Sequence, residues 1–140
     1  MAEYESVLKF DSYTVDKINF NRNDKFEYKN KPIKIDFGIK KSKIVEDDKM
    51  IIKLYIELFK DAEENNFPFE MSVDITGYFT ISDPTEKINF EPNAIAILYP
   101  YIRSIVSTYT VNANIGPIIL PAINVNEMIK KEQEDKDKKD

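Results

Sequence analysis

The sequence predicts an α+β fold in which a four-stranded antiparallel meander is followed by two helices. Apolar and polar residues alternate through most of residues 7–81, which is the pattern of half-buried strands. Residues 92–111 instead repeat their apolar side chains at the three-and-four spacing of a helix face. A length of 140 residues with 42% hydrophobic residues suits one soluble domain. We therefore expect a single domain over residues 1–130 and a charged, disordered tail over residues 131–140.

The first two predicted strands differ in regularity. The first covers about residues 7–20 and places Ile18 and Phe20 on one face. The second begins after Pro32, where a missing backbone N–H does little harm. Its alternation separates a polar face from an apolar face that consists of Ile33, Ile35, Phe37 and Ile39. Most of residues 40–48 are charged, and we interpret this stretch as a turn.

The third and fourth predicted strands show the clearest alternation. Residues 50–59 have one fully apolar face and one half-polar face, as expected of a central strand. Residues 61–66 are polar and are interpreted as a hairpin loop. Apolar residues then recur at almost every second position from Phe67 to Ile81, and Gly77 within this run suggests a bulge or bend.

The first predicted helix covers residues 92–111, with Pro92 and Asn93 at its start. Pro100 lies inside this run and cannot donate a backbone hydrogen bond. The helix therefore begins after Leu98 or is kinked there.

The residues after this helix predict an extended segment and a second helix. Residues 115–125 contain too many prolines for a helix and too many apolar residues for an exposed linker, so they should lie across another surface. Asn124 followed by Glu127 suits a capped helix start. Residues 130–140 carry as many basic as acidic side chains, which favours a frayed or disordered end.

The residue types that are missing exclude much of the commonest catalytic chemistry. The chain contains no Cys and no His, the residues of most zinc sites and of most activated nucleophiles. Glycines stand at positions 38, 77 and 116, too far apart for a phosphate-binding loop. Paired carboxylates such as Glu63 and Glu64 lie in predicted turns or in the tail and are interpreted as solvated charges. We expect no enzyme activity, no cofactor and no metal.

The charge balance and the apolar runs bear on partners and location. A formal net charge of −5 argues against nucleic acid as the main partner. The first ten residues lack the apolar core of a secretory signal, and no apolar run approaches the roughly 20 residues that span a bilayer. We therefore expect a cytoplasmic protein without an integral membrane segment.

The apolar residues exceed what one small sheet and two modest helices readily cover. The chain contains nine Phe and eight Tyr, two partly apolar strand faces and the Pro-interrupted apolar segment of residues 115–125. Such an excess predicts oligomerisation, or an apolar groove for another molecule. Phe67, Phe69, Met71 and Val73 form an apolar stripe that favours a core position, although Met and Phe also suit adaptable binding surfaces.

Two short motifs resemble the SecB family of export chaperones. Residues 98–103 read LYPYIR and residues 116–124 read GPIILPAIN, where that family has stretches close to LFPYAR and FPxLxLAPVNF. Tyr13 with residues 18–20 is similar to that family's first strand, and residues 77–81 are similar to its fourth. The resemblance covers about residues 8–130.

The resemblance implies an ATP-independent chaperone, or holdase. Its protomers would assemble as a dimer of dimers, a homotetramer, with helices between two sheets. Apolar grooves would hold unfolded client polypeptides, such as preproteins, in a translocation-competent state. Such a protein needs no catalytic His or Cys, and its acidic surface would favour basic clients. Because it binds the unfolded state preferentially, it would keep the client unfolded.

Eight positions match those that line or support the client grooves of that family, and each also suits a core position. They are Ile33, Ile35, Phe37, Phe69, Met71, Val73, Met128 and Ile129. Arg103 is expected to be structural, through pairing at a helix–helix interface.

Four further positions match those that dock the translocase motor SecA in related chaperones. Those chaperones have acidic residues at two positions of the first strand, and a Leu and a Glu on the fourth. Here the positions hold Lys17, Asn21, Glu70 and Ser72, so both first-strand acidic residues are missing. The sequence leaves open whether the partner is SecA or the antitoxin of a toxin–antitoxin system. A module that binds a small apolar ligand is a further alternative.

Overall fold

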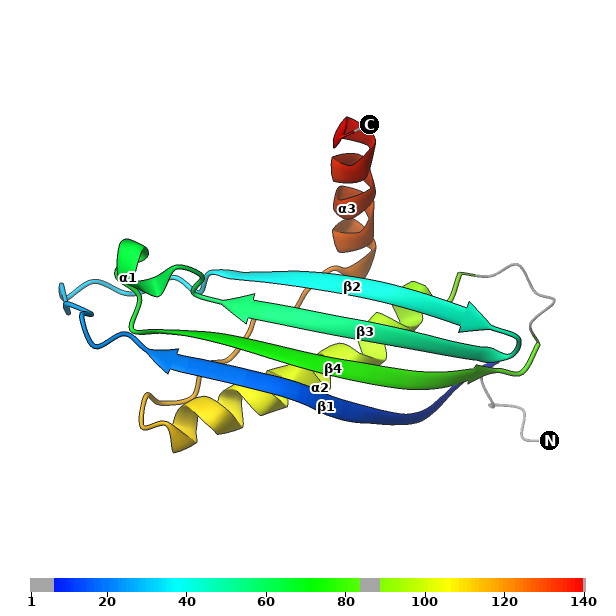
Figure 1. Ribbon diagram of the computed structural model, residues 1–140, viewed down its shortest axis with the longest axis horizontal. Helices are drawn as coiled ribbons and strands as arrows, with labels where there is room; N and C mark the ends of the chain where they lie inside the picture. The colour runs from blue at the N-terminus through cyan, green and yellow to red at the C-terminus, as the bar shows by residue number, and fades with distance from the viewer. Residues whose placement is uncertain (1–6, 84–88, 140) are drawn as a thin grey trace. The chain divides into compact units, whose positions relative to one another are not determined.

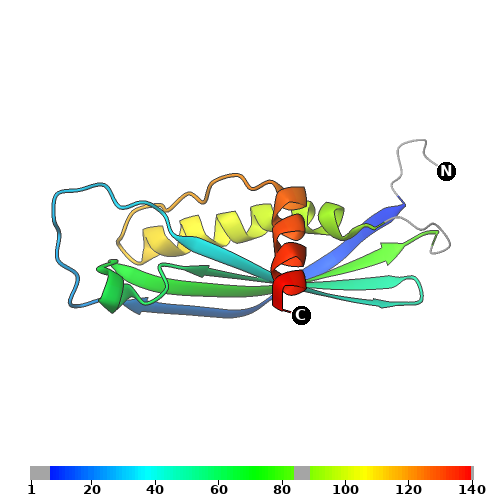
Figure 2. The same ribbon diagram turned by 90° about the horizontal axis from the view of Figure 1, so that it is seen from above.

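The computed structural model describes residues 7–83 and 89–139, which divide into a sheet unit up to Ser82 and a helical unit from Asp83 onward (Figures 1 and 2). The sheet unit contains β1 (Leu8–Arg22), β2 (Phe37–Glu46), β3 (Lys49–Leu58), α1 (Ala62–Asn65) and β4 (Phe69–Ile81). The helical unit contains α2 (Glu91–Asn112) and α3 (Val125–Lys139). The predicted α+β fold, with four antiparallel strands followed by helices, is confirmed.

The order of the strands is β1-β4-β3-β2, and every neighbouring pair is antiparallel (Figure 1). β2, β3 and β4 are successive neighbours, whereas β1 lies beside β4. The arrangement is therefore a Greek-key order and not the simple meander that the sequence predicts. The reason lies in the connection between β1 and β2, which covers residues 23–36 and is too long for a tight hairpin.

β2 begins later and ends later than predicted. Its first paired residue is Phe37, and Ile33 and Ile35 lie in the irregular stretch before it. Residues 40–46 belong to the strand, so the predicted charged turn is wrong except at Asp47 and Asp48. The pattern was misleading because lysines occupy positions 41 and 43, where an alternating strand would have apolar residues. An edge strand tolerates such lysines.

The irregularities of the sheet lie in β1, not at Gly77. β4 pairs with β3 without a register shift, and Gly77 lies opposite both Ile52 and Tyr13. The pairing of β1 with β4 shifts at Asp11 and again at Asp16, so these two residues occupy bulges. The predicted loop at residues 61–66 contains the short helix α1, flanked by Asp61 (φ 57°) and Asn66 (φ 54°) in left-handed conformations.

α2 begins at Glu91 and includes Pro100, so the helix does not begin after Leu98. Its start is close to the predicted one, with Pro92 in the first turn, where a missing N–H is harmless. The backbone N–H of Glu91 donates to Asn89 Oδ1 at 3.1 Å, which adds a partner at the helix start.

α3 follows the irregular residues 115–124, and its start agrees with the predicted cap. Asn124 Oδ1 accepts a hydrogen bond from the N–H of Glu127 at 3.0 Å. The helix continues to Lys139, so residues 131–139 are helical where the sequence predicts a disordered tail, and Asp140 lies outside the described residues. Acidic residues repeatedly stand four positions before lysines in this sequence, a spacing that supports a helix by itself.

Candidate functional site

The register of the four strands defines one apolar face of the sheet. On the two central strands this face is fully buried: Ile52, Leu54, Ile56 and Leu58 of β3 are at most 1% exposed. Their partners on β4 are equally buried. Aromatic side chains extend the face, since the rings of Phe20 and Phe69 stack with centroids 5.2 Å apart.

The predicted client-binding residues of β4 belong to this buried part. Phe69, Met71 and Val73 are 0%, 2% and 0% exposed. Their burial agrees with the core interpretation of the stripe.

The margins of the apolar face are more accessible. On β2, Phe37 and Ile39 are half-buried and Val45 is 53% exposed. The irregular stretch before β2 adds Ile33, which is 41% exposed, and the half-buried Ile35. We call the alternate residues from Ile33 to Val45 the β2 strip; the set consists of Ile33, Ile35, Phe37, Ile39, Lys41, Lys43 and Val45. Three of the eight predicted client-binding residues therefore lie on one accessible margin.

The β2 strip is anchored at the point where the strand begins. The backbone N–H of Phe59 donates to the carbonyl oxygen of Asp36 at 2.8 Å, so the pairing of the β2 side with the β3 side continues one residue beyond Phe37. Phe59 is itself buried against Phe67 and Phe69. The residue before β2, Asp36, is thus hydrogen-bonded to the buried Phe59, while Ile33 stays exposed.

In the helical unit, the predicted residues Met128 and Ile129 lie in the first turns of α3 and are half-buried. The stretch before α3 runs back along α2 (Figure 2). Arg103 Nε donates to the carbonyl oxygen of Leu120 at 3.0 Å, and Ser107 Oγ donates to that of Ile118 at 2.9 Å. Residues 118–121 are therefore held through their backbone, and Leu120 is fully buried.

Tyr99 and Thr110 complete this contact along α2. The Tyr99 hydroxyl donates to the carbonyl oxygen of Pro121, and the Thr110 hydroxyl accepts a hydrogen bond from the N–H of Ile118 at 3.0 Å. Burial raises the pKa of Tyr99, although nearby Arg103 acts in the opposite direction, so the hydroxyl keeps its proton for donation. The LYPYIR motif thus places Tyr99 and Arg103 one turn apart to hold the next segment.

The four positions that correspond to SecA docking share the opposite, polar face of the sheet. Asn21 lies directly opposite Glu70, and Ser72 is one pair further along, opposite Asn19. Lys17 lies opposite Asp74 on the same face. Asn19, Asn21, Glu70 and Ser72 line a hollow of about 230 Å³. The register therefore brings together the positions that the sequence singled out, with mixed charges.

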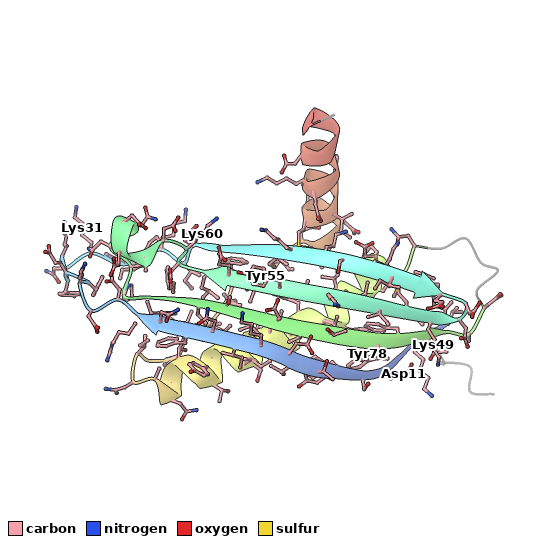
Figure 3. The ribbon with its side chains drawn as sticks, viewed as in Figure 1. Asp11, Lys31, Lys49, Tyr55, Lys60 and Tyr78 are labelled. Atoms are coloured by element: carbon pink, nitrogen blue, oxygen red, sulfur yellow. The ribbon has the colours of Figure 1, made fainter. Side chains whose placement is uncertain are left out.

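The polar face also contains a feature that sequence reasoning missed. The two bulge residues of β1 accept hydrogen bonds from threonines of β4: Thr80 donates to Asp11 and Thr76 donates to Asp16. Lys49 Nζ in turn donates to Thr80 at 2.8 Å, and Figure 3 shows Asp11 and Lys49 at the same end of the sheet. The sequence contains no signal for these hydrogen bonds, because the alternation of β1 does not reveal which of its residues form bulges.

The carboxylate in the second bulge is electrostatically distinct. The hydroxyl groups of Thr76 and Thr14, which donate to Asp16, and the positive charge of Lys53 hold the pKa of Asp16 below its usual value of 3.8, while burial acts in the opposite direction. Among the described residues, no group of three or more acidic side chains lies close enough to hold a metal ion. The two Asp–Thr hydrogen bonds therefore join β1 to β4.

The structure resembles that of the SecB-like chaperone of Mycobacterium tuberculosis, solved in complex with a peptide from the HigA1 antitoxin. The TM-score is 0.63 at 13% identity, and the match covers 83% of this chain and 90% of that one. The sheet and helices therefore define an α+β protein with the fold of that chaperone.

Sequence comparisons place the chain more narrowly. It is 37% identical over 134 residues to an uncharacterized protein of Methanocaldococcus jannaschii, a match that covers 91% of this chain and 86% of the relative. Residues 10–136 match the family described as preprotein translocase subunit SecB. The chain belongs to the SecB family. Within residues 7–83 and 89–139, none of the helices combines the length and the apolar character that crossing a membrane requires.

Proposed function

We propose that this protein is an ATP-independent chaperone that binds non-native polypeptides and keeps them unfolded. The observation that carries the proposal is the β2 strip, an accessible apolar margin in a chain of the SecB family. An extended polypeptide presents every second side chain to one side, which matches the spacing of the strip. Binding of this kind needs surface contact and no reactive group.

The working particle in this proposal is a cytoplasmic homotetramer. Apolar side chains at several further places support association between copies. Val15 and Ile18 on the apolar side of the edge strand β1 are 45% and 38% exposed, and Ile119 after α2 is 64% exposed. Val15 and Ile18 lie on the same face of β1 and continue its apolar side, and contiguous exposed apolar side chains often mark interaction surfaces.

The client in this proposal is a cytoplasmic polypeptide, and an antitoxin is favoured over a preprotein. The polar face supports this choice, because Lys17 and Asn21 stand where SecA-docking chaperones have acidic residues. The structurally similar SecB-like chaperone of Mycobacterium tuberculosis was solved in complex with a peptide from an antitoxin, which makes that class of client the first to test.

The test measures aggregation of a chemically unfolded model protein after dilution, without ATP. We expect the chain to suppress light scattering by the aggregating client. We also expect a mass near four times 16.4 kDa by light scattering during size-exclusion chromatography. A monomeric particle would contradict the tetramer. A folded protein that leaves aggregation unchanged, and retains a small molecule in native mass spectrometry, would favour the apolar-ligand alternative.

A further inference from the structure

The connection between β1 and β2 is fixed near both of its ends. The side chain of Asn66 makes two hydrogen bonds with the backbone of Glu27. The N–H of Glu27 donates to Asn66 Oδ1, and Asn66 Nδ2 donates to the carbonyl oxygen of Glu27, both at 2.9 Å. At the other end, the carbonyl oxygen of Asp36 accepts from the N–H of Phe59. The connection is therefore held to the sheet unit on both sides of its middle part.

This middle part, residues 28–34, is exposed along its whole length, and we call it the arm. The structure describes all of its residues, and their only hydrogen bond is a local one, from the Tyr28 hydroxyl to Asn30 Oδ1 at 3.1 Å. Its two large apolar side chains, Tyr28 and Ile33, are 75% and 41% exposed. The arm thus offers backbone groups and apolar side chains to a binding partner, at a place that the two ends define.

The arm is cationic in a chain whose formal net charge is −5. It carries Lys29, Lys31 and Lys34 and no acidic residue. Within the arm, none of these lysines takes part in a hydrogen bond or an ion pair. Figure 3 shows Lys31 beyond the end of the strands, in the region of α1. The nearest acidic residues in the sequence are Glu27 and Asp36 at the fixed ends, and residues 27–36 as a whole remain positively charged.

The arm leads directly into the β2 strip. Ile33 belongs to both, and the strip continues with Ile35 and Phe37. An extended polypeptide rises about 3.3 Å per residue, so a client that lies along the strip reaches the arm within a few residues. A nucleic acid is a poor candidate for this surface, because the acidic chain as a whole repels a polyanion. The charge of the arm instead suits a short acidic stretch of polypeptide.

We infer that the arm is a docking surface for an acidic segment of the client, next to the apolar segment that the β2 strip binds. The inference rests on the proposed chaperone function and adds a partner chemistry to it. The net charge of −5 would by itself favour basic clients. At physiological ionic strength the Debye length is about 8 Å, so a carboxylate that contacts the arm responds mainly to the lysines of the arm.

The test uses three short, end-capped peptides that carry a fluorescent label. Each has a middle part in which apolar residues alternate with serine, flanked on both sides by Asp in one peptide, by Asn in the second and by Lys in the third. Their affinities for the full chain are measured by fluorescence anisotropy. We expect the Asp peptide to bind about tenfold more tightly than the Asn peptide, since several exposed ion pairs together contribute on that scale. The Lys peptide should bind most weakly, and high salt should reduce the differences.

Variants assign the preference to the arm. The Lys29→Gln/Lys31→Gln/Lys34→Gln protein should bind the Asp and Asn peptides equally, with the affinity for the Asn peptide unchanged. Because these side chains are exposed and have no hydrogen bonds, the triple variant should keep the native circular dichroism spectrum. The matched control removes the same charge from three exposed lysines of the sheet unit outside the arm, Lys40, Lys53 and Lys60, and should keep the preference.

Hydrogen exchange locates the bound peptide independently of the variants. In the free protein the backbone N–H groups of residues 29–34 should exchange rapidly, because they have no hydrogen-bond acceptors. A saturating amount of the Asp peptide should slow their exchange severalfold. Unchanged exchange of these groups in the complex would show that the acidic segment binds elsewhere.

Two further outcomes overturn the inference, and a third concerns the proposed function. Equal binding of the three peptides by the unaltered protein would show that the arm does not select acidic segments. A preference that survives in the triple variant, or that the control loses equally, would assign it to other charges. The Asn peptide reports on the chaperone function alone. If no peptide binds whatever its charge, and aggregation is not suppressed, the proposed function fails together with the preference.

Discussion

Arg103 on α2 and Leu120 in the segment before α3 are joined by a hydrogen bond of 3.0 Å from the guanidinium Nε to the backbone carbonyl oxygen. The sequence places the arginine at the end of the LYPYIR motif and predicts a structural role at a helix–helix interface. The structure gives a more specific role, because the partner is the irregular segment that leads into α3. Arg103 also lies over the ring of Tyr99, 6.0 Å from its centroid.

Arg103→Met should therefore destabilise the protein by about 1.5–3 kcal/mol, the range for a hydrogen bond that involves a charged group. Methionine keeps much of the apolar contact of the side chain but cannot donate to Leu120. The free energy of unfolding in urea measures the effect. Ser104→Met on the exposed side of the same helix is the control and should change little. Equal stability of both variants would show that the Arg103 contact contributes nothing.

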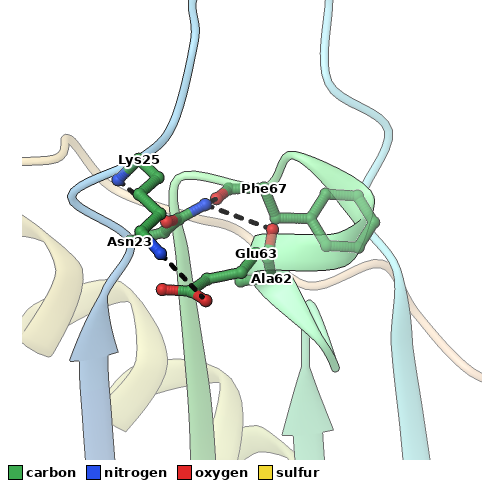
Figure 4. Close-up of polar contacts among 5 residues, drawn as sticks. All are labelled: Asn23, Lys25, Ala62, Glu63 and Phe67. Atoms are coloured by element: carbon green, nitrogen blue, oxygen red, sulfur yellow. Dashed lines mark hydrogen bonds and ion pairs between the residues drawn. The ribbon is translucent and has the colours of Figure 1, made fainter.

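Asn23→Ala should cost about 2–3 kcal/mol, because it removes three side-chain hydrogen bonds to backbone groups. Asn23 is 7% exposed, and its Nδ2 donates to the carbonyl oxygens of Ala62 and Phe67 at 3.2 and 2.9 Å (Figure 4). Its Oδ1 accepts from the N–H of Lys25 at 3.0 Å. Chemical denaturation is the measurement, with the exposed Asn19→Ala as the control. A loss no larger than that of the control would contradict this anchoring of α1.

The pairing of Asp16 with Thr76 predicts a specific dependence of stability on pH. Because the pKa of Asp16 is lowered in the folded protein, its contribution is fully present above the unfolded value near 3.8 and is lost as the pH falls through the folded value. Thr76→Val removes the largest cause of the lowering. The variant should therefore lose stability relative to the unaltered protein above about pH 4, and this loss should shrink at lower pH.

Asp16→Asn supplies the control for that prediction. In a protein that already carries Asp16→Asn, the further change Thr76→Val should have an effect that does not depend on pH between about 2 and 5. Unfolding free energies of the four proteins, measured in urea at several pH values, complete the cycle. A pH-dependent effect of Thr76→Val in the Asp16→Asn background would assign the dependence to another group.

Ile35→Asp and Phe69→Asp should have opposite kinds of effect, although the sequence assigns both residues to client binding. Ile35 is half-buried on the β2 strip, so its variant should fold and bind a labelled, unfolded client peptide about tenfold more weakly. Phe69 is 0% exposed, so a carboxylate there should unfold the protein.

Circular dichroism reports on folding, and the fluorescence anisotropy of a labelled client peptide reports on binding, so together they separate the two cases. Ser42→Asp places the same charge on the polar side of β2 and should retain both the native spectrum and the affinity. A folded Phe69→Asp protein with weakened binding would show that the β4 stripe is part of the client surface after all. Unchanged binding by Ile35→Asp would remove Ile35 from that surface.

Most elements could be predicted because their signals are local. The alternation of β3 and β4, the helical spacing around Ile102 and the cap at Asn124 each depend on residues within a few positions. The family resemblance is also a property of short motifs. Prediction failed where a residue departs from its strand pattern: Lys41 and Lys43 concealed the second half of β2, and the bulges at Asp11 and Asp16 have no periodic signature.

The sequence by itself determined the fold class, the family and the set of candidate client residues. The tertiary structure decided which strands are neighbours, and hence which candidates are accessible. Ile33 and Phe69 follow the same alternating rule, yet Ile33 is 41% exposed before an edge strand, while Phe69 is 0% exposed on a central one. The physical reason is that alternation specifies the side of a strand, whereas burial depends on what lies next to it, and that is set by contacts distant in the chain.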